Sequence, residues 1–313
     1  MNHLLCILVS FLLSAALMAL VLPLLRKLGA GQSVLSYVKQ HASKNGTPTM
    51  GGLTFVAAIS AASLIFDDAS DNRVALTLAV TAGFAVVGFL DDFIKIRRRH
   101  NEGLKPYQKI LFQLAIAVIA AVYCYINGIT SVNVPFGGGI AADIGAAVVP
   151  LVLFVFVATV NCVNLTDGLD GLAAGTSAAY LVSLGTMLNI TGGFGGATAL
   201  AGAGALAGFL LFNTNKASVF MGDTGSLALG GLISCLSVFS GNVLYIPLIG
   251  IMFVLSGISV IVQVIYYKRT GRRVFLMAPL HHHLQMKGLA EGKIAYVYFA
   301  VTALVGTVCL IFA

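Results

Sequence analysis

Residues 74–92 read VALTLAVTAGFAVVGFLDD, an apolar run of helix-spanning length that ends in two adjacent aspartates. Apolar runs of about 17 to 25 residues can cross the hydrocarbon core of a bilayer as a helix. Because backbone polar groups must be paired inside a bilayer, long uninterrupted runs indicate helices rather than the alternating strands of a barrel. Such runs predict ten membrane-spanning helices, at 4–25, 50–66, 74–90, 110–126, 144–163, 172–190, 194–212, 224–240, 243–267 and 294–313.

The composition also indicates a membrane protein. Of the 313 residues, 58% are apolar and 9% are charged. Soluble domains carry about 25% charged residues, so a soluble multidomain protein is excluded. We therefore expect an all-α, polytopic chain that forms one integral-membrane domain over residues 1–313. One connection, 127–143, alternates polar and apolar residues and predicts a short external β-hairpin.

The basic residues are distributed unevenly between the connections. Nearly all of them follow odd-numbered predicted helices, whereas the connections after even-numbered helices hold only Arg73. The positive-inside rule therefore predicts that the odd connections are cytoplasmic and that both termini lie outside. The net charge of +7 is concentrated on this face, where it would attract anionic headgroups and nucleotide phosphates.

Asp91 and Asp92 fall on the same predicted face. Carboxylates at the end of a membrane helix are costly unless they are paired or solvated, and the helix dipole disfavours them there. An energetically unfavourable position of this kind indicates a functional role for the two carboxylates. Mg²⁺ prefers one or two carboxylates together with phosphate oxygens. The alternative is an interfacial acidic pair that is matched by Lys95 and Arg97.

A second polar segment, NCVNLTDGLDG, occupies residues 161–171. Its polar groups Asn161, Asn164, Asp167 and Asp170 recur every three residues, so they could share one wall of a site. Amides and carboxylates can pair with the edge of a nucleobase, and glycines allow a ring to approach the backbone. Alternatively, Asp167 or Asp170 caps the following helix.

Two glycine-containing segments lie on this face as well. Residues 47–52, TPTMGG, follow Lys44, which could contact a phosphate or the nucleoside, although a plain junction between loop and helix is equally consistent. Residues 220–226, FMGDTGS, offer Asp223 as a third metal ligand. Phe220 offers an aromatic face to a nucleobase, although an ordinary buried aromatic residue would look the same.

The fifth segment is APLHHH, at residues 278–283. Three consecutive histidines cannot all face one way on a helix, so at most one or two can converge on a site. They could bind a phosphate oxygen or order a metal-bound group. The alternative is a histidine loop that has no role in the site.

Together these segments resemble the polyprenyl-phosphate N-acetylhexosamine-1-phosphate transferase superfamily, and the resemblance covers essentially the whole chain. The motifs that carry it are TPTMGG at 47–52, DD at 91–92, NLTDGLDGLA at 164–173, FMGDTGSLALGG at 220–231 and APLHHH at 278–283. The first and last of these resemble the branch that transfers phospho-MurNAc-pentapeptide. A branch that transfers N-acetylglucosamine-1-phosphate is the alternative.

The resemblance implies transfer of phospho-MurNAc-pentapeptide from UDP-MurNAc-pentapeptide to undecaprenyl phosphate, which yields lipid I and UMP in peptidoglycan synthesis. It further implies an enzyme of the bacterial inner membrane with a cytoplasmic active site and Mg²⁺ as its cofactor. The implied partners are membrane lipids and a second copy of the chain in a homodimer, with no nucleic acid. The main rival outside enzymes is a secondary transporter. Transporters place their ionisable groups near the bilayer midplane, whereas these acids lie at predicted helix ends on one side.

The resemblance also implies roles for individual residues. It places catalysis at Asp91, Asp92, Asp223, Lys95, Lys44, Asp167 and His281, with Asp223 as the Mg²⁺ ligand and Asp91 and Asp92 beside it. It places substrate binding at Thr49, Asn161, Asn164, Leu165, Gly168, Asp170, Asn213, Phe220 and His282, with Phe220 stacked on uracil. The expected chemistry is direct attack by the lipid phosphate, and the rival is a covalent aspartyl-phosphate intermediate.

Overall fold

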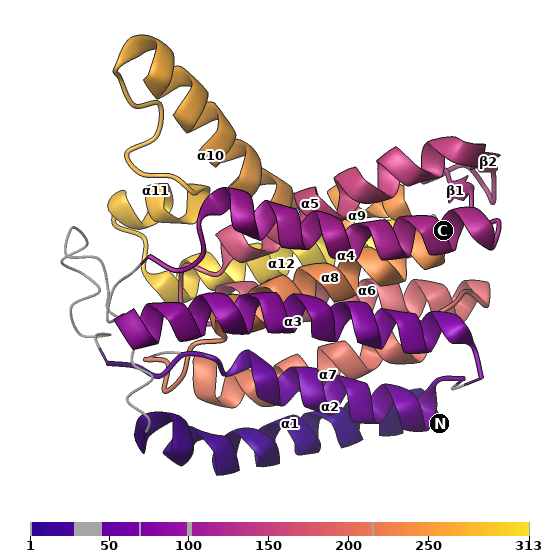
Figure 1. Cartoon of the computed structure of the whole chain (residues 1–313), viewed down its shortest axis with the longest axis horizontal. Helices are drawn as coiled ribbons and strands as arrows, with labels where there is room; N and C mark the ends of the chain where they lie inside the picture. The colour runs from indigo at the N-terminus through magenta and orange to yellow at the C-terminus, as the bar shows by residue number, and fades with distance from the viewer. Residues whose placement is uncertain (1, 28–45, 69, 99–101, 215, 313) are drawn as a thin grey trace.

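The computed structural model describes residues 2–27, 46–68, 70–98, 102–214 and 216–312. These residues form a helical bundle with one small sheet, which confirms the predicted all-α class (Figure 1). Its helices are α1 (Asn2–Lys27), α2 (Gly52–Phe66), α3 (Asn72–Arg98), α4 (Pro106–Ile126), η2 (Gly145–Ala147), α5 (Val148–Thr166), α6 (Leu172–Thr191), α7 (Gly196–Asn213), α8 (Gly222–Phe239), η3 (Val243–Tyr245), α9 (Ile246–Ile249), α10 (Ile251–Thr270), α11 (Leu280–Met286) and α12 (Glu291–Ile311).

The described helices include eight that are long and apolar enough to cross a membrane, namely α1, α3, α4, α5, α7, α8, α10 and α12. The predicted spans at 50–66 and 172–190 correspond to α2 and α6. α2 is apolar but has only 15 residues, and α6, with 20 residues, is not among the eight. A polytopic membrane protein is therefore confirmed, whereas the count of ten spans stays a prediction.

One predicted helix end and one predicted continuous span are wrong. α3 does not end at residue 90 but continues to Arg98, so Asp91 and Asp92 lie within the helix. The helix can continue because both carboxylates have partners inside the protein, as described below. The predicted span 243–267 is broken into η3, α9 and α10, since Pro247 has no N–H to donate and Gly250 weakens a helix.

The predicted hairpin is present. β1 (Ser131–Asn133) and β2 (Ala141–Asp143) pair antiparallel, with Ser131 opposite Asp143. The backbone N–H of Asn133 donates to the carbonyl of Gly241 at 2.8 Å, which fastens the hairpin to the turn after α8. Figure 1 places the hairpin and both termini at one end of the bundle, with α11 near the other end.

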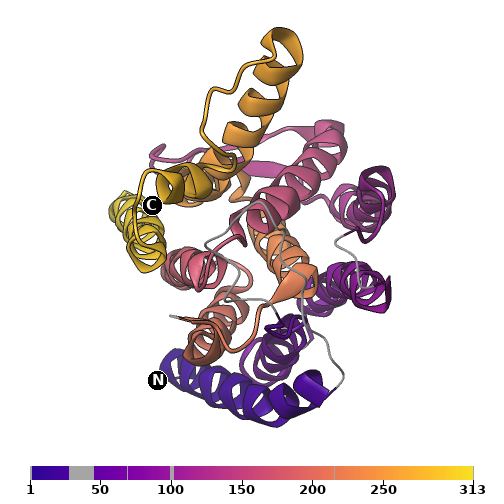
Figure 2. The same cartoon turned by 90° about the vertical axis from the view of Figure 1, so that its left-hand side faces the viewer.

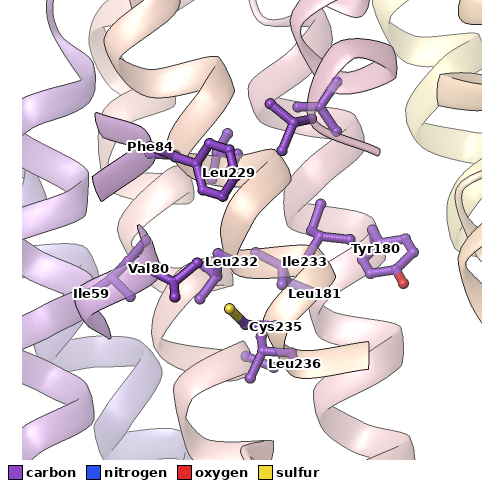
Figure 3. Packing of buried hydrophobic residues seen from close by; sticks show 14 of the residues in the cluster. Ile59, Val80, Phe84, Tyr180, Leu181, Leu229, Leu232, Ile233, Cys235 and Leu236 are labelled. Atoms are coloured by element: carbon purple, nitrogen blue, oxygen red, sulfur yellow. The ribbon is translucent and has the colours of Figure 1, made fainter. Parts of the chain in front are cut away.

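α8 lies at the centre of the bundle, and residues 224–239 are buried throughout (Figure 2). Small residues allow its neighbours to approach closely, as is common between membrane helices. A Cβ at Gly230 would overlap the backbone of Val160 in α5, and one at Gly231 would lie 2.5 Å from the ring of Phe84 in α3. Figure 3 shows Phe84 beside Leu229 in this core. The three helices that carry most of the polar motifs are thus packed directly together.

Candidate active site

Three carboxylates meet where the C-terminal part of α3 packs against the start of α8. Asp91 and Asp92 come from α3, and Asp223 comes from the first turn of α8. One oxygen from each lies within 4.8 Å of the others, close enough to hold one metal ion. Asp91 and Asp92 are buried, so their charges require partners inside the protein. A cluster of carboxylate oxygens is also the donor set that Mg²⁺ prefers, and the residues present therefore fit such an ion.

Two lysines supply part of the opposing charge. Lys95, one turn after Asp91 on α3, places its Nζ 2.6 Å from Asp91 Oδ2 and 3.1 Å from Asp223 Oδ2. Lys109 on α4 places its Nζ 3.1 Å from Asp91 Oδ1 and 2.5 Å from Asp223 Oδ2. The sequence motifs do not include Lys109. Its one signal in the sequence is its position at the end of a basic connection, directly before the predicted helix 110–126.

Asp92 differs from Asp91 in its partners. Its Oδ2 accepts the backbone N–H of Thr224 at 3.0 Å and the Thr224 hydroxyl at 2.7 Å, while its Oδ1 accepts the N–H of Asp223 at 3.2 Å. The first N–H groups of a helix lack partners within it, and an anion is favoured at this end of the dipole. Asp92 thus caps α8 from a neighbouring helix and determines where Asp223 lies.

The segments at 47–52 and 220–226 are paired through their backbones. Phe220 N–H donates to Pro48 O at 2.8 Å, and Gly51 N–H donates to Phe220 O at 2.9 Å. The pairing brings Thr49 beside Gly222 and close to Asp92. A Cβ added at Gly222 would contact the side chains of both residues. Thr49 is buried, and its hydroxyl has no hydrogen-bond partner among the described residues.

Lys44 lies outside the described residues. Leu165 and Phe220 are both half-buried.

The four polar groups of 161–171 do not share one wall, contrary to expectation. Asn164 reaches the cluster, where its Nδ2 donates to Asp223 Oδ1 at 2.9 Å and to Ser226 Oγ at 2.8 Å. Asn161 instead donates to Gln113 Oε1 on α4 at 2.7 Å. A repeat of three residues drifts around a helix of 3.6 residues per turn, so α5 directs the two amides to different neighbours.

Asp170 points toward the segment before α8, where its Oδ2 accepts the N–H of Ala217 at 2.9 Å. The alternative, in which Asp167 or Asp170 caps the next helix, is wrong, because the N-cap of α6 is Gly171 and has no side-chain cap bond. Asn213 holds the same region together. Its Oδ1 accepts the N–H of Gly171 at 3.1 Å, and its Nδ2 donates to Val219 O at 2.9 Å. Both polar atoms of the Asn213 amide thus bond to backbone groups rather than to the clustered aspartates.

Asp167 follows the last residue of α5 and is half-buried. Burial, followed by the charges of Asp223 and Asp92, raises its pKa to about 8. A carboxyl group with such a pKa can hold or release a proton near neutral pH.

His281 and His282 converge on Gly168. This agrees with the prediction that at most one or two of the three histidines face one site. A Cβ at Gly168 would overlap His281 Nε2 and lie 3.1 Å from His282 Nε2. The two rings have centroids 4.4 Å apart. His283 turns away and accepts the N–H of Leu276 through Nδ1 at 3.1 Å.

His281 is fully buried on α11, and neither ring nitrogen has a hydrogen-bond partner in the described part of the chain. Burial, with a smaller contribution from His282, lowers its pKa to about 3, so the ring is neutral at physiological pH. A neutral imidazole with free nitrogens can accept a hydrogen bond from a ligand or donate one to it.

Comparison with known proteins identifies the class of this chain. The model of glycosyl transferase family 4 matches residues 74–241, more than half of the chain, including all three clustered aspartates. Curated relatives named phospho-N-acetylmuramoyl-pentapeptide-transferase occur in Clostridioides difficile (41% identity over 97% of this chain and 95% of the relative), Bacillus subtilis (42%, 94% and 92%) and Geobacillus kaustophilus (44%, 94% and 92%). The chain therefore belongs to the phospho-N-acetylmuramoyl-pentapeptide-transferase family. It is a transferase, and the resemblance noted in its motifs is confirmed.

Proposed function

We propose that this chain transfers phospho-MurNAc-pentapeptide from UDP-MurNAc-pentapeptide to undecaprenyl phosphate, releasing UMP and forming lipid I for peptidoglycan synthesis. The observation that carries the proposal is the cluster of Asp91 and Asp223 with Lys95 and Lys109 at one end of a membrane bundle. Relatives at 41 to 44% identity carry the name of this reaction over nearly their whole length, which favours it over transfer of N-acetylglucosamine-1-phosphate.

Asp223 would hold Mg²⁺, with Asp91 and Asp92 beside it. Asp92 is the weaker ligand, because its oxygens already accept three hydrogen bonds from the start of α8. Bound Mg²⁺ would neutralise the charge of the diphosphate and favour departure of UMP. The two lysines reach the same carboxylates and would offset the remaining charge on the phosphates.

The uridine would lie between the segments that flank the acids. Phe220 would stack on uracil, and Leu165, Gly168 and Asp170 would complete this pocket. Lys44, Thr49, Asn164 and Asp167 would line the rest of the donor site, with Asn213, His281 and His282 at its rim. Asn161 would contribute indirectly, because its amide donates to Gln113 on α4. The unpartnered nitrogens of His281 support a ligand contact there, whereas the backbone bonds of Asn213 favour a supporting role.

The reaction would proceed by direct attack of the lipid phosphate on the donor phosphorus, with Asp91 accepting a proton. A covalent aspartyl-phosphate intermediate is the rival, and isotope exchange separates the two. Exchange of labelled UMP into UDP-MurNAc-pentapeptide without the lipid would require the intermediate. We expect no exchange until undecaprenyl phosphate is added.

The basic connections support a cytoplasmic active site with both termini outside, in the inner membrane of a bacterium. We further propose a homodimer. Accessibility of single cysteines to an impermeant thiol reagent tests the orientation, with probes at Asp68, in the connection before α3, and at Arg97, in the last turn of α3. Labelling of only the Asp68 probe from outside supports this orientation, and labelling of the Arg97 probe overturns it. Mass measurement of the detergent complex tests the dimer.

The decisive assay uses purified protein, undecaprenyl phosphate and Mg²⁺, with UDP-MurNAc-pentapeptide or UDP-GlcNAc as the donor. We expect UMP release and a pyrophosphoryl lipid product only with the first donor. Release of UMP from UDP-GlcNAc alone would assign the chain to the alternative reaction.

A further inference from the structure

The outer half of α10 leaves the helical bundle (Figures 1 and 2). Large apolar side chains surround it and are 39 to 58% exposed, namely Ile261, Val262, Val264, Ile265, Tyr266 and Tyr267. A helix that is apolar on all sides is stable either in a protein core or among lipid chains. Since the bundle does not cover this half of α10, its apolar side chains are suited to contact with lipid chains.

The apolar half ends in a cluster of four basic residues, which we call the basic tip: Lys268, Arg269, Arg272 and Arg273. All four are exposed. No carboxylate forms an ion pair with any of them in the part of the chain that the structure describes, although acids elsewhere in it do pair with lysine or arginine. Long basic side chains at the end of an apolar helix extend toward the headgroup region.

The turn that carries the basic tip is held by specific hydrogen bonds. Gly271 ends α10 with φ +67°, a left-handed conformation that glycine adopts readily, and its N–H donates to Tyr267 O at 2.9 Å. Gln263 Oε1 then accepts the N–H groups of Val274 at 3.2 Å and Phe275 at 2.9 Å. These bonds fold the chain back along α10, so both pairs of basic residues stay together at its end.

We propose that the basic tip is a binding surface for the phosphate groups of anionic phospholipids. Charge complementarity identifies the partner, because four clustered cations without acidic partners attract anions. The position identifies the source, because an apolar helix in lipid brings its basic end to the phospholipid headgroups. Each lysine or arginine at an anionic membrane surface adds to this attraction. The site is separate from the acid cluster, which lies within the bundle on α3 and α8.

Tryptophan fluorescence provides a direct test, because the chain contains no tryptophan. In the full chain, Val274→Trp places one fluorophore beside the basic tip, at a side chain that is 46% exposed. The protein is reconstituted into vesicles that contain equal amounts of phosphatidylglycerol and phosphatidylcholine, with one or the other lipid brominated. Since the basic residues enrich anionic lipid around them, we expect brominated phosphatidylglycerol to quench at least about twice as strongly. Equal quenching by the two lipids overturns the proposal.

The variant Arg269→Gln/Arg272→Gln/Arg273→Gln should lose this preference, while the matching Arg→Lys variant should keep it. Arg26→Gln/Lys27→Gln removes charge from the end of α1 and should leave the preference at Val274→Trp unchanged. A preference that survives the glutamine variant would overturn the assignment to the basic tip. Addition of UDP-MurNAc-pentapeptide should not relieve the quenching, and relief would instead identify the donor diphosphate as the ligand.

Discussion

Gly88 of α3 packs directly against the backbone of Asp223 in α8. A Cβ at Gly88 would overlap the carbonyl group of Asp223 and would lie 2.5 Å from the amide nitrogen of Thr224. Gly88 is one helical turn before Asp91 and Asp92, so this contact determines how closely the three carboxylates meet. A residue with no charge and no side chain thus controls the geometry of the proposed metal site.

Gly88→Ala should therefore disrupt the site. The added methyl must push α3 away from α8, and overpacking of this kind costs about 1–3 kcal/mol. We expect a lower unfolding temperature in detergent and a large loss of turnover. Gly83→Ala on the same helix is the control, because its nearest neighbour would be Ile116 Cδ1 at 3.4 Å, an ordinary contact. Equal effects of the two variants would show that the close approach at Gly88 is unimportant.

Asp223→Asn should reduce turnover by about a hundredfold or more, the usual scale for removing one electrostatic group from an active site. The amide cannot ligate Mg²⁺ as a carboxylate does and removes the charge that faces Lys95 and Lys109. Chelation of the metal should inactivate the unmodified protein, and Mg²⁺ should raise its unfolding temperature but not that of the variant. Asp143→Asn, on the exposed strand β2, is the matched control. An active, Mg²⁺-dependent Asp223→Asn protein would remove the metal assignment.

Lys109→Gln tests the lysine that only the structure identified. Loss of its ammonium leaves Lys95 as the remaining described cation at the cluster, so we expect turnover to fall by about a hundredfold. Arg97→Gln removes an exposed charge from the end of α3 and should have little effect. Steady-state assays over a range of donor concentrations measure both variants. Normal kinetics in Lys109→Gln would mean that its ion pairs are structural only.

His281 should make stability depend on pH. Its folded-state pKa is about 3, below the ordinary value of 6.5, so the unfolded chain binds the proton more readily between these values. The contribution of His281 to stability is therefore complete above about pH 6.5 and is lost as the pH falls toward 3, at about 1.4 kcal/mol per pH unit.

His281→Gln should flatten this acid dependence of the unfolding temperature, measured between pH 7.5 and the lowest pH at which the protein stays dispersed. His3→Gln, at an exposed position near the start of α1, should keep it. An unchanged slope in His281→Gln would show that another group controls acid stability.

The structure assigns different partners to residues that looked equivalent in the motifs. Asp91 and Asp92 are adjacent, yet one pairs with Lys95 and Lys109 and the other caps α8. Asn161 and Asn164 are three residues apart, yet only Asn164 reaches Asp223. These differences could not be predicted, because each depends on how one helix is rotated against another.

The sequence alone determined the helical class, the approximate positions of most helices, the hairpin and the gathering of the polar motifs at one end of the bundle. The length of an apolar run and the composition of a turn are local properties, so they can be predicted without knowledge of the tertiary packing. Only the tertiary structure decided that α3 continues past its aspartates, that α10 leaves the bundle and that Lys109 joins the cluster. The reason is that a buried charge or a helix end takes its partner from segments distant in the chain, as Asp91 does from Lys109 and α8 does from Asp92.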